Sequence, residues 1–209
     1  GYTVPGGLIQ YHLIGSELLE TDAGICLLPL ESELGYAESA LLEPWGCVMA
    51  AYTQRRRLKP KKDGVMWIIG QPGDTRRYQF SEGLKKADTL IFTDVPENLA
   101  RLAESTSAQV VVANELEPDA YASFCEAFND GNGIDDIIVL APQSAAMVSE
   151  VAKQVARRGT LNLVGQEPLD GLVDADVGRL HYDYIAFIGN ATNDISASYG
   201  ERRNRCELR

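Results

Sequence analysis

Residues 64–80, GVMWIIGQPGDTRRYQF, join an apolar run to a turn that contains two glycines. The run VMWII is stopped by Gly70, and Pro72 and Gly73 follow it closely. In a dinucleotide-binding βαβ unit, a strand of this kind leads into the pattern G-x-G-x-x-G and then into a helix. In the turn after the strand, only Gly70 and Gly73 supply glycines. The stretch therefore predicts a nucleotide-binding unit whose phosphate loop lacks part of its glycine pattern.

Apolar runs rich in Val and Ile recur along the rest of the chain and alternate with segments of helical character. The expected strands are 65–69, 88–94, 108–114, 135–142, 160–165 and 184–189. The expected helices are about 77–86, 96–105, 118–128 and 143–158. Near-continuous apolar strands are typical of a parallel sheet covered by helices on both faces. The predicted fold class is α/β, a doubly wound, mainly parallel Rossmann-like sheet with flanking helices.

Charge and hydropathy exclude several classes of partner. The chain has 209 residues and a formal net charge of −11, so we expect no nucleic-acid partner, because an acidic protein repels phosphate backbones. The longest apolar runs are too short to cross a bilayer and no signal pattern is present, which predicts a cytoplasmic protein with no membrane partner. The four cysteines form no C-x-x-C pair and are expected to be free thiols: Cys26, Cys47, Cys125 and Cys206.

The first third of the sequence has a different character. Residues 1–35 mix short apolar runs with Gly and Pro and predict strands and loops. Between 37 and 52 a helical stripe is interrupted by Pro44, which predicts two shorter helices or a kink, and Pro60 ends it. The basic run RRRLKPKK, residues 55–62, is interpreted as a solvated helix end, with a phosphate site as the alternative. Because the chain lacks an initial Met and stops within an expected helix, we expect a piece of a longer protein.

The loop after the first strand allows two interpretations. Gly73 can serve as the glycine that lets the backbone approach a pyrophosphate, but Arg76 falls where the packing glycine is expected. Asp74 and Thr75 are good helix N-cap residues. Thr75, Arg76 and Arg77 could instead bind phosphate through a hydroxyl and two guanidinium groups. We expect a loop with the geometry of a phosphate turn that binds NAD weakly, if at all.

Asp94 is the best single cofactor signal in the sequence. It ends the expected strand TLIFTD and lies 21 residues after Gly73, where dinucleotide-binding units place an acidic residue that binds the adenosine ribose. The alternative is a helix cap before Pro96. Because a carboxylate here disfavours a ribose 2′-phosphate, the sequence favours NAD over NADP.

Two segments carry a resemblance to a known family. Residues 27–58, LLPLESELGYAESALLEPWGCVMAAYTQRRRL, resemble the join between the two domains of zinc-dependent medium-chain dehydrogenases, the superfamily of alcohol, sorbitol and threonine dehydrogenases. Residues 182–200, YDYIAFIGNATNDISASYG, look like the last Rossmann strand of that family and the helix behind it. The departure is the loop GQPGDTRR, where usual members have a full glycine fingerprint.

The resemblance implies a division of the chain and a metal site. It implies that residues 1–35 are a remnant of the junction with a GroES-like catalytic domain, and that residues 36–209 are a Rossmann-like nucleotide-binding domain. In the family, zinc acts as a Lewis acid beside the nicotinamide. Cys47 and Glu43 match positions from which members place metal ligands, so zinc is expected in the full-length protein. The alternative for these two is a buried cysteine and a helix-end carboxylate.

Two functions are consistent with these observations. The first is the cofactor-binding domain of a zinc-dependent, NAD-linked alcohol, polyol or threonine-type dehydrogenase, with Gly70, Gly73 and Thr75 holding the pyrophosphate and Asp94 the ribose. Its substrate would be a small alcohol or polyol. The second is a degenerate Rossmann-like module that has lost its dinucleotide and serves as a scaffold or as the surface of a homo-oligomer. A methyltransferase on a similar sheet ranks last, because it gives no reason for the segment EPWGC.

Overall fold

A computed structural model gives the fold of the chain. It describes all residues except 1–10, 21–26, 28, 31–32, 54–55 and 201–209. Cys26, Cys206, Arg55 and part of the strands expected before residue 35 lie outside the described residues. The chain separates into two compact units, Gly1–Thr53 and Gln54–Arg209. The domain boundary expected at residue 35 stays a prediction about a longer protein.

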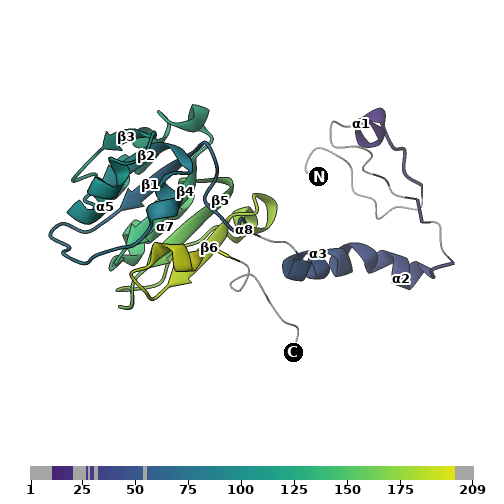
Figure 1. The fold of residues 1–209 in the computed structure, drawn as a ribbon. Coiled ribbons are helices and arrows are strands. Elements are labelled where there is room, and N and C mark those ends of the chain that lie inside the picture. Colours follow the sequence, from purple (N-terminus) through teal and green to yellow (C-terminus); the bar gives the residue numbers. More distant parts are fainter. Residues whose placement is uncertain (1–10, 21–26, 28, 31–32, 54–55, 201–209) are drawn as a thin grey trace. The chain divides into compact units, whose positions relative to one another are not determined.

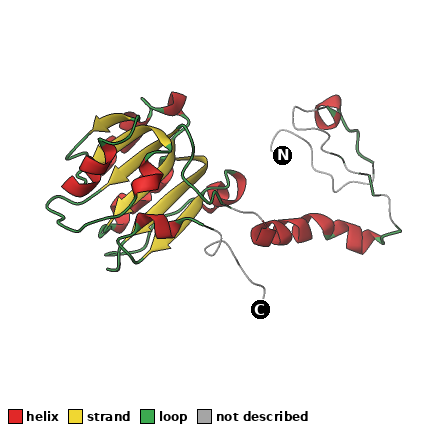
Figure 2. Cartoon of the chain, in the orientation of Figure 1, coloured by secondary structure: helices red, strands yellow, loops and turns green. Residues whose placement is uncertain are grey.

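The second unit is built on six parallel strands in the order β3-β2-β1-β4-β5-β6 (Figures 1 and 2). The strands are β1 Gly64–Ile69, β2 Ala87–Thr93, β3 Gln109–Val112, β4 Ile134–Leu140, β5 Val155–Val164 and β6 Ala186–Asn190. All five neighbouring pairs run parallel, which confirms the predicted fold class. The strand order reverses at β1 and β4, so the switch point of the sheet lies between their carboxyl ends.

Helices cover both faces of this sheet. The bounds are α4 Ser81–Leu84, α5 Glu97–Ala103, α6 Tyr121–Cys125, α7 Ala145–Lys153 and α8 Val177–Tyr182, with 3₁₀ turns at η1 Pro118–Ala120, η2 Asn129–Gly131 and η3 Ile195–Ser198. Residues of α6 and α7 are buried in one apolar cluster, and residues of α4, α5 and η3 are buried in the other. The sheet is therefore the middle layer of three.

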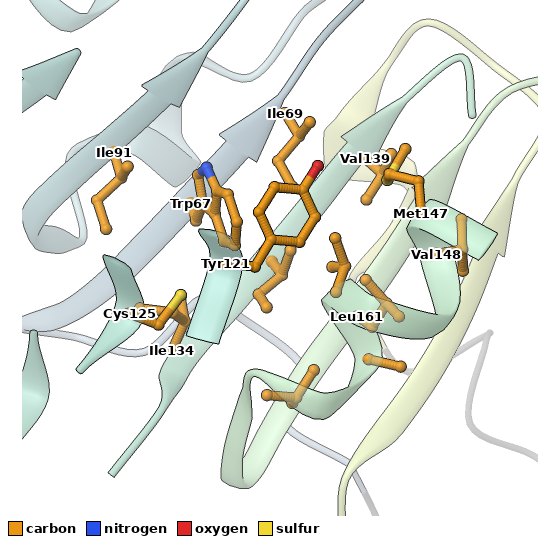
Figure 3. Packing of buried hydrophobic residues seen from close by; sticks show 14 of the residues in the cluster. Trp67, Ile69, Ile91, Tyr121, Cys125, Ile134, Val139, Met147, Val148 and Leu161 are labelled. Atoms are coloured by element: carbon orange, nitrogen blue, oxygen red, sulfur yellow. The ribbon is translucent and has the colours of Figure 1, made fainter. Parts of the chain in front are cut away.

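Alternation along β1 shows why its apolar run must be buried on both sides. Trp67 and Ile69 belong to the cluster under α6 and α7, whereas Met66 and Ile68 belong to the opposite cluster. Trp67 is fully buried, and its ring meets that of Tyr121 edge to face at a centroid distance of 5.0 Å. Figure 3 shows these two rings side by side within the cluster. A strand without a polar face fits only between two layers of helices.

Two helix predictions were wrong in their extent. In place of a helix over 77–86, only the single turn α4 is helical, because Gln79, just before it, pairs with the distant residue Asp194. The helix expected over 143–158 ends at Lys153, since Val155 already pairs with Ile134 of β4. The extra residues form an irregularity in β5, where Arg158 has a φ of 61°.

The first unit contains three helices in its described residues: α1 Ser16–Leu19, α2 Tyr36–Ala40 and α3 Leu42–Thr53. The prediction of two shorter helices near Pro44 is confirmed, and the break falls at Leu41. Pro44 lies in the first turn of α3, where its missing N–H removes no helical hydrogen bond. The described part of residues 1–35 contains a helix and no strand, so the prediction of strands is wrong there.

The described part of the basic run, residues 56–62, is not a solvated helix end, because α3 ends at Thr53 and two of the cations, Arg57 and Lys61, meet buried acids. Arg57 donates from Nη1 to Oδ2 of Asp136 at 2.9 Å and from Nη2 to Oδ1 at 3.1 Å. Lys61 Nζ lies 2.8 Å from Oδ1 of Asp135. The carboxylates of Asp135 and Asp136, at the start of β4, are 5% and 2% exposed. The run therefore fastens the chain to the amino end of the sheet.

No helix in the described part of the chain combines the length and the apolar character that crossing a bilayer requires.

Candidate functional site at the carboxyl end of the first two strands

Gly70 brings the ends of β1 and β2 into backbone contact. Its N–H donates to the carbonyl of Thr93 at 2.7 Å. A Cβ on Gly70 would lie 2.1 Å from the carbonyl oxygen of Asp94 and 3.0 Å from Cα of Val95. Both neighbours are backbone atoms that a side chain cannot displace. The position therefore requires glycine for close approach to β2, and it sets Asp94 beside the loop.

Gly73 has a different reason to be glycine. Asp74 N–H donates to the carbonyl of Gln71 at 3.0 Å, with Pro72 second and Gly73 third in the turn. Gly73 has a φ of 75°, which this position of a type II turn requires. A Cβ on Gly73 would meet nothing within 4 Å. Its glycine character is thus explained by backbone conformation, whatever role it has toward a pyrophosphate.

No helix starts where a phosphate loop would end. The chain from Thr75 to Tyr78 has no regular structure, and α4 begins at Ser81 after Phe80, which makes no side-chain cap. Because a pyrophosphate is normally held by the exposed N–H groups of a helix N-terminus, that contact is absent from this part of the structure. The suggestion that Asp74 or Thr75 caps a helix is wrong for the same reason.

The connection pairs instead with the segment after β6. Gln79 N–H donates to the carbonyl of Asn193 at 3.0 Å, and Ile195 N–H donates to the carbonyl of Gln79 at 3.0 Å. The ring of Phe80 stacks on that of Tyr199 at 5.9 Å. The sequence NATND, residues 190–194, is thus held by the β1–β2 connection. Sequence reasoning missed this pairing because no local pattern signals it.

Asp74 is the centre of the loop's polar contacts. Its Oδ1 accepts hydrogen bonds from the backbone N–H of Arg76 at 3.0 Å and from Nε at 2.8 Å, and its Oδ2 accepts one from the hydroxyl of Tyr78 at 2.9 Å. The Asp74 side chain is 3% exposed and that of Arg76 is 43% exposed. Burial alone would raise the pKa of Asp74, but the bonds from Arg76 and Tyr78 outweigh it, so the pKa lies below its usual value. Burial and the bond to Asp74 raise the pKa of Tyr78.

Asp94 lies immediately after β2, as predicted, and has a φ of 48°. Its backbone N–H donates to Oδ1 of Asn114 at 3.0 Å, and its Oδ2 accepts the N–H of Glu115 at 3.2 Å. These contacts tie the ends of β2 and β3 together. The carboxylate caps no helix in this arrangement: the N-cap residue of α5 is Pro96. Its role toward a ribose stays a prediction.

A cavity of about 790 Å³ opens between the loop and the start of α5. Its lining comes from residues 74–80 and from the segment 96–102. Asn98 donates from Nδ2 to the carbonyl of Tyr78 at 2.7 Å and so joins the two walls. The lining includes no residue of β4, so the cavity is not the crevice at the switch point. Thr75, Arg76 and Arg77, which were singled out as phosphate contacts, all line it.

Glu43 and Cys47 lie on successive turns of α3, in the first unit. The thiol of Cys47 donates to Oε1 of Glu43 at 3.1 Å. This bond, with the nearby negative charge, raises the pKa of Cys47. No group of three His, Cys, Asp or Glu that could hold a metal occurs among the residues that the structure describes. The two residues are therefore adjacent, as a pair of ligands would be, but they form an incomplete set.

Comparison with known proteins finds relatives among the alcohol and polyol dehydrogenases. No family model matches the chain. The chain is 24% identical over 213 residues to a mannitol-1-phosphate 5-dehydrogenase of Aliivibrio fischeri, a match that covers 91% of this chain and 49% of that protein. The chain thus spans about half the length of the curated relative that it matches.

Similar solved structures are named as alcohol dehydrogenases. A benzyl alcohol dehydrogenase of Acinetobacter calcoaceticus has a TM-score of 0.46 at 18% identity, covering 81% of this chain and 44% of its own. An alcohol dehydrogenase zinc-binding domain protein of Burkholderia ambifaria has a TM-score of 0.47 at 21% identity, covering 82% and 44%. Their names fall within the alcohol dehydrogenase-like group that the sequence resembles.

Proposed function

We propose that this chain is the cofactor-binding part of an NAD-linked dehydrogenase that acts on a small alcohol or polyol. The observation that carries the proposal is the position of Asp94. It comes directly after β2 in a sheet of order 3-2-1-4-5-6, beside the Gly70 turn. Dinucleotide-binding domains with this strand order use such a carboxylate to bind the adenosine ribose. The similarity to a mannitol-1-phosphate 5-dehydrogenase supports an alcohol or polyol as the substrate class.

The residues present fit one half of a dinucleotide better than the other. Gly70 keeps the loop close to Asp94, so the ribose end of the cofactor has a carboxylate within a compact turn. At the pyrophosphate, Gly70, Gly73 and Thr75 remain the proposed contacts. The N–H groups of Gly70 and Asp74 are already used within the protein, and Pro72 has none. We therefore propose a weak NAD site that binds mainly through the adenosine.

Zinc binding is proposed only for a longer protein that contains this chain. When bound, zinc supplies Lewis-acid stabilisation of the substrate oxygen. A thiolate and a carboxylate are ordinary zinc ligands, so Cys47 and Glu43 fit two positions of a tetrahedral set. In this chain the thiol of Cys47 donates to Glu43, and it would have to lose that proton to serve as a zinc ligand.

A degenerate module without a dinucleotide is the second candidate. It is favoured by the pairing of Gln79 with residues 193–195. This pairing replaces the helix that would hold a pyrophosphate. Such a domain would serve as a scaffold or as a surface for association of identical chains.

Calorimetric titration with NAD separates the two candidates. If the chain is a cofactor-binding domain, NAD should bind saturably with a Kd above about 10 μM. Its affinity should then be about tenfold or more lower in Asp94→Ala. Asp88→Ala is the matched control, because Asp88 is an exposed acid near the opposite end of the same strand. Absence of binding up to about 1 mM NAD would support the degenerate module instead.

A further inference from the structure

The carboxylate of Asp74 lies among the polar donors of the β1–β2 loop, as an anion supplied by the protein itself. The three donors are the backbone N–H of Arg76, its Nε and the hydroxyl of Tyr78, at 3.0, 2.8 and 2.9 Å from the carboxylate oxygens. With 3% of its side chain exposed, the carboxylate leaves solvent little access to these bonds. The arrangement is a filled anion site.

The donors are of the kinds that phosphate groups use. Guanidinium groups, hydroxyls and backbone N–H groups bind phosphate oxygens in the same way as they bind a carboxylate. The site lies past the carboxyl end of β1, where domains of this topology place a ligand pyrophosphate. We infer that Asp74 is a specificity-determining residue, whose carboxylate takes the place of a ligand phosphate and excludes phosphate-bearing ligands from the donors of Arg76 and Tyr78.

The site has a route to solvent once the carboxylate is gone. Asp74, Arg76 and Tyr78 all line the cavity of about 790 Å³ beside α5. Arg77 lines the same cavity, and the described part of the chain offers it no ion-pair partner. A phosphate entering from the cavity would therefore meet two guanidinium groups. The inference rests on the proposed function only in taking this turn as the counterpart of a phosphate loop.

The test is a calorimetric titration with inorganic pyrophosphate. We expect Asp74→Ala to bind pyrophosphate about tenfold or more tightly than the unchanged chain. Asp74→Asn keeps the shape of the side chain and removes its charge, so its gain should be clearly smaller. Asp88→Asn removes one negative charge from an exposed position near the opposite end of β2 and should change nothing. A gain in Asp74→Ala alone identifies occupancy, rather than net charge, as the cause.

A second substitution tests the donors. Arg76→Ala should leave pyrophosphate binding of the unchanged chain as it is, but should abolish the gain in the Asp74→Ala background. Far-UV circular dichroism and a cooperative thermal transition establish folding. If Asp74→Ala does not fold, Asp74→Ser carries the same comparison, because its hydroxyl can still accept the N–H of Arg76.

The inference is overturned if a folded Asp74→Ala or Asp74→Ser binds pyrophosphate no better than the unchanged chain. It is also overturned if Asp88→Asn gives an equal gain. Either result leaves the Asp94-dependent binding of NAD untouched. Conversely, a gain that depends on Arg76 supports the inference even where the unchanged chain binds no NAD. The two proposals therefore succeed or fail separately.

Discussion

The guanidinium of Arg57 forms two hydrogen bonds to the carboxylate of Asp136 across 79 positions of sequence. Thr160 donates a third to Oδ1 at 2.6 Å, and the N–H of Lys61 a fourth to Oδ2 at 2.8 Å. All the oxygen positions of a buried carboxylate are thereby satisfied at the amino end of the sheet, opposite the candidate site. Removing one partner would leave the others uncompensated.

Arg57→Ala should lower the free energy of unfolding by about 3 kcal/mol, the low end for breaking a buried pair, because the Arg57 side chain is 25% exposed. Urea denaturation measures it. Lys62→Ala is the control, since Lys62 and Asp63 are 81% and 74% exposed and their pair should contribute about 1 kcal/mol or less. Equal effects of the two substitutions would contradict the assignment of Arg57 as a fastening residue.

Gly70→Ala should destabilise the domain by about 3 kcal/mol or more, because the new Cβ overlaps the carbonyl of Asp94 and only a backbone shift relieves it. Gly73→Ala in the same turn should cost about 1 kcal/mol, for its positive φ alone. Urea denaturation of the two variants compares them. A Gly70→Ala protein as stable as Gly73→Ala would show that the ends of β1 and β2 are less tightly apposed.

Asp74 should make the stability of the domain depend on acid pH. Because its folded pKa is lowered below the ordinary value of 3.8, its contribution is complete above that pH and is lost as the pH falls through the folded pKa. Asp74→Asn should therefore be less stable than the unchanged chain by about 1 kcal/mol at pH 7, a figure kept small by the exposure of Arg76. The difference should shrink toward pH 3. A difference independent of pH would rule out this linkage.

Glu43→Gln should speed the alkylation of Cys47 by roughly twofold or more at pH 8, because the hydrogen bond to the carboxylate favours the neutral thiol. Mass spectrometry of the labelled peptides gives the rate for each cysteine. Cys125 serves as an internal control: burial raises its pKa to about 12, so it should react only after unfolding. Glu38→Gln, on α2, should leave the rate at Cys47 unchanged.

The chain alone should show no zinc-dependent reduction of NAD with any alcohol. Cys47 and Glu43 supply two donors, and a catalytic zinc needs three protein ligands. Absorbance at the wavelength of NADH, with and without added zinc, measures the reaction on a panel of alcohols and polyols. Turnover that requires zinc and is lost in Cys47→Ala would overturn this expectation.

Local patterns were enough to predict the sheet. Runs such as VMWII leave a strand no polar face, and this requires helices on both sides of it. The same patterns placed Gly70 and Asp94 at strand ends, which the structure confirms for both positions. They also predicted two helices near Pro44; the break falls at Leu41, and Pro44 lies in the first turn of α3, where proline is tolerated.

The sequence by itself thus determined the layers of the domain, their order along the chain and the ends of β1 and β2. Only the tertiary structure decided the path of the chain after Gly70, because Gln79 pairs with residues 193–195 from the far end of the chain. It also decided that Asp136 could be buried, since Arg57 neutralises it from a loop before the first strand. Hydrophobic periodicity is a property of neighbouring residues. Buried charges and irregular loops, in contrast, pair with residues that lie far away in the sequence. A local hydrophobic pattern does not predict such pairs.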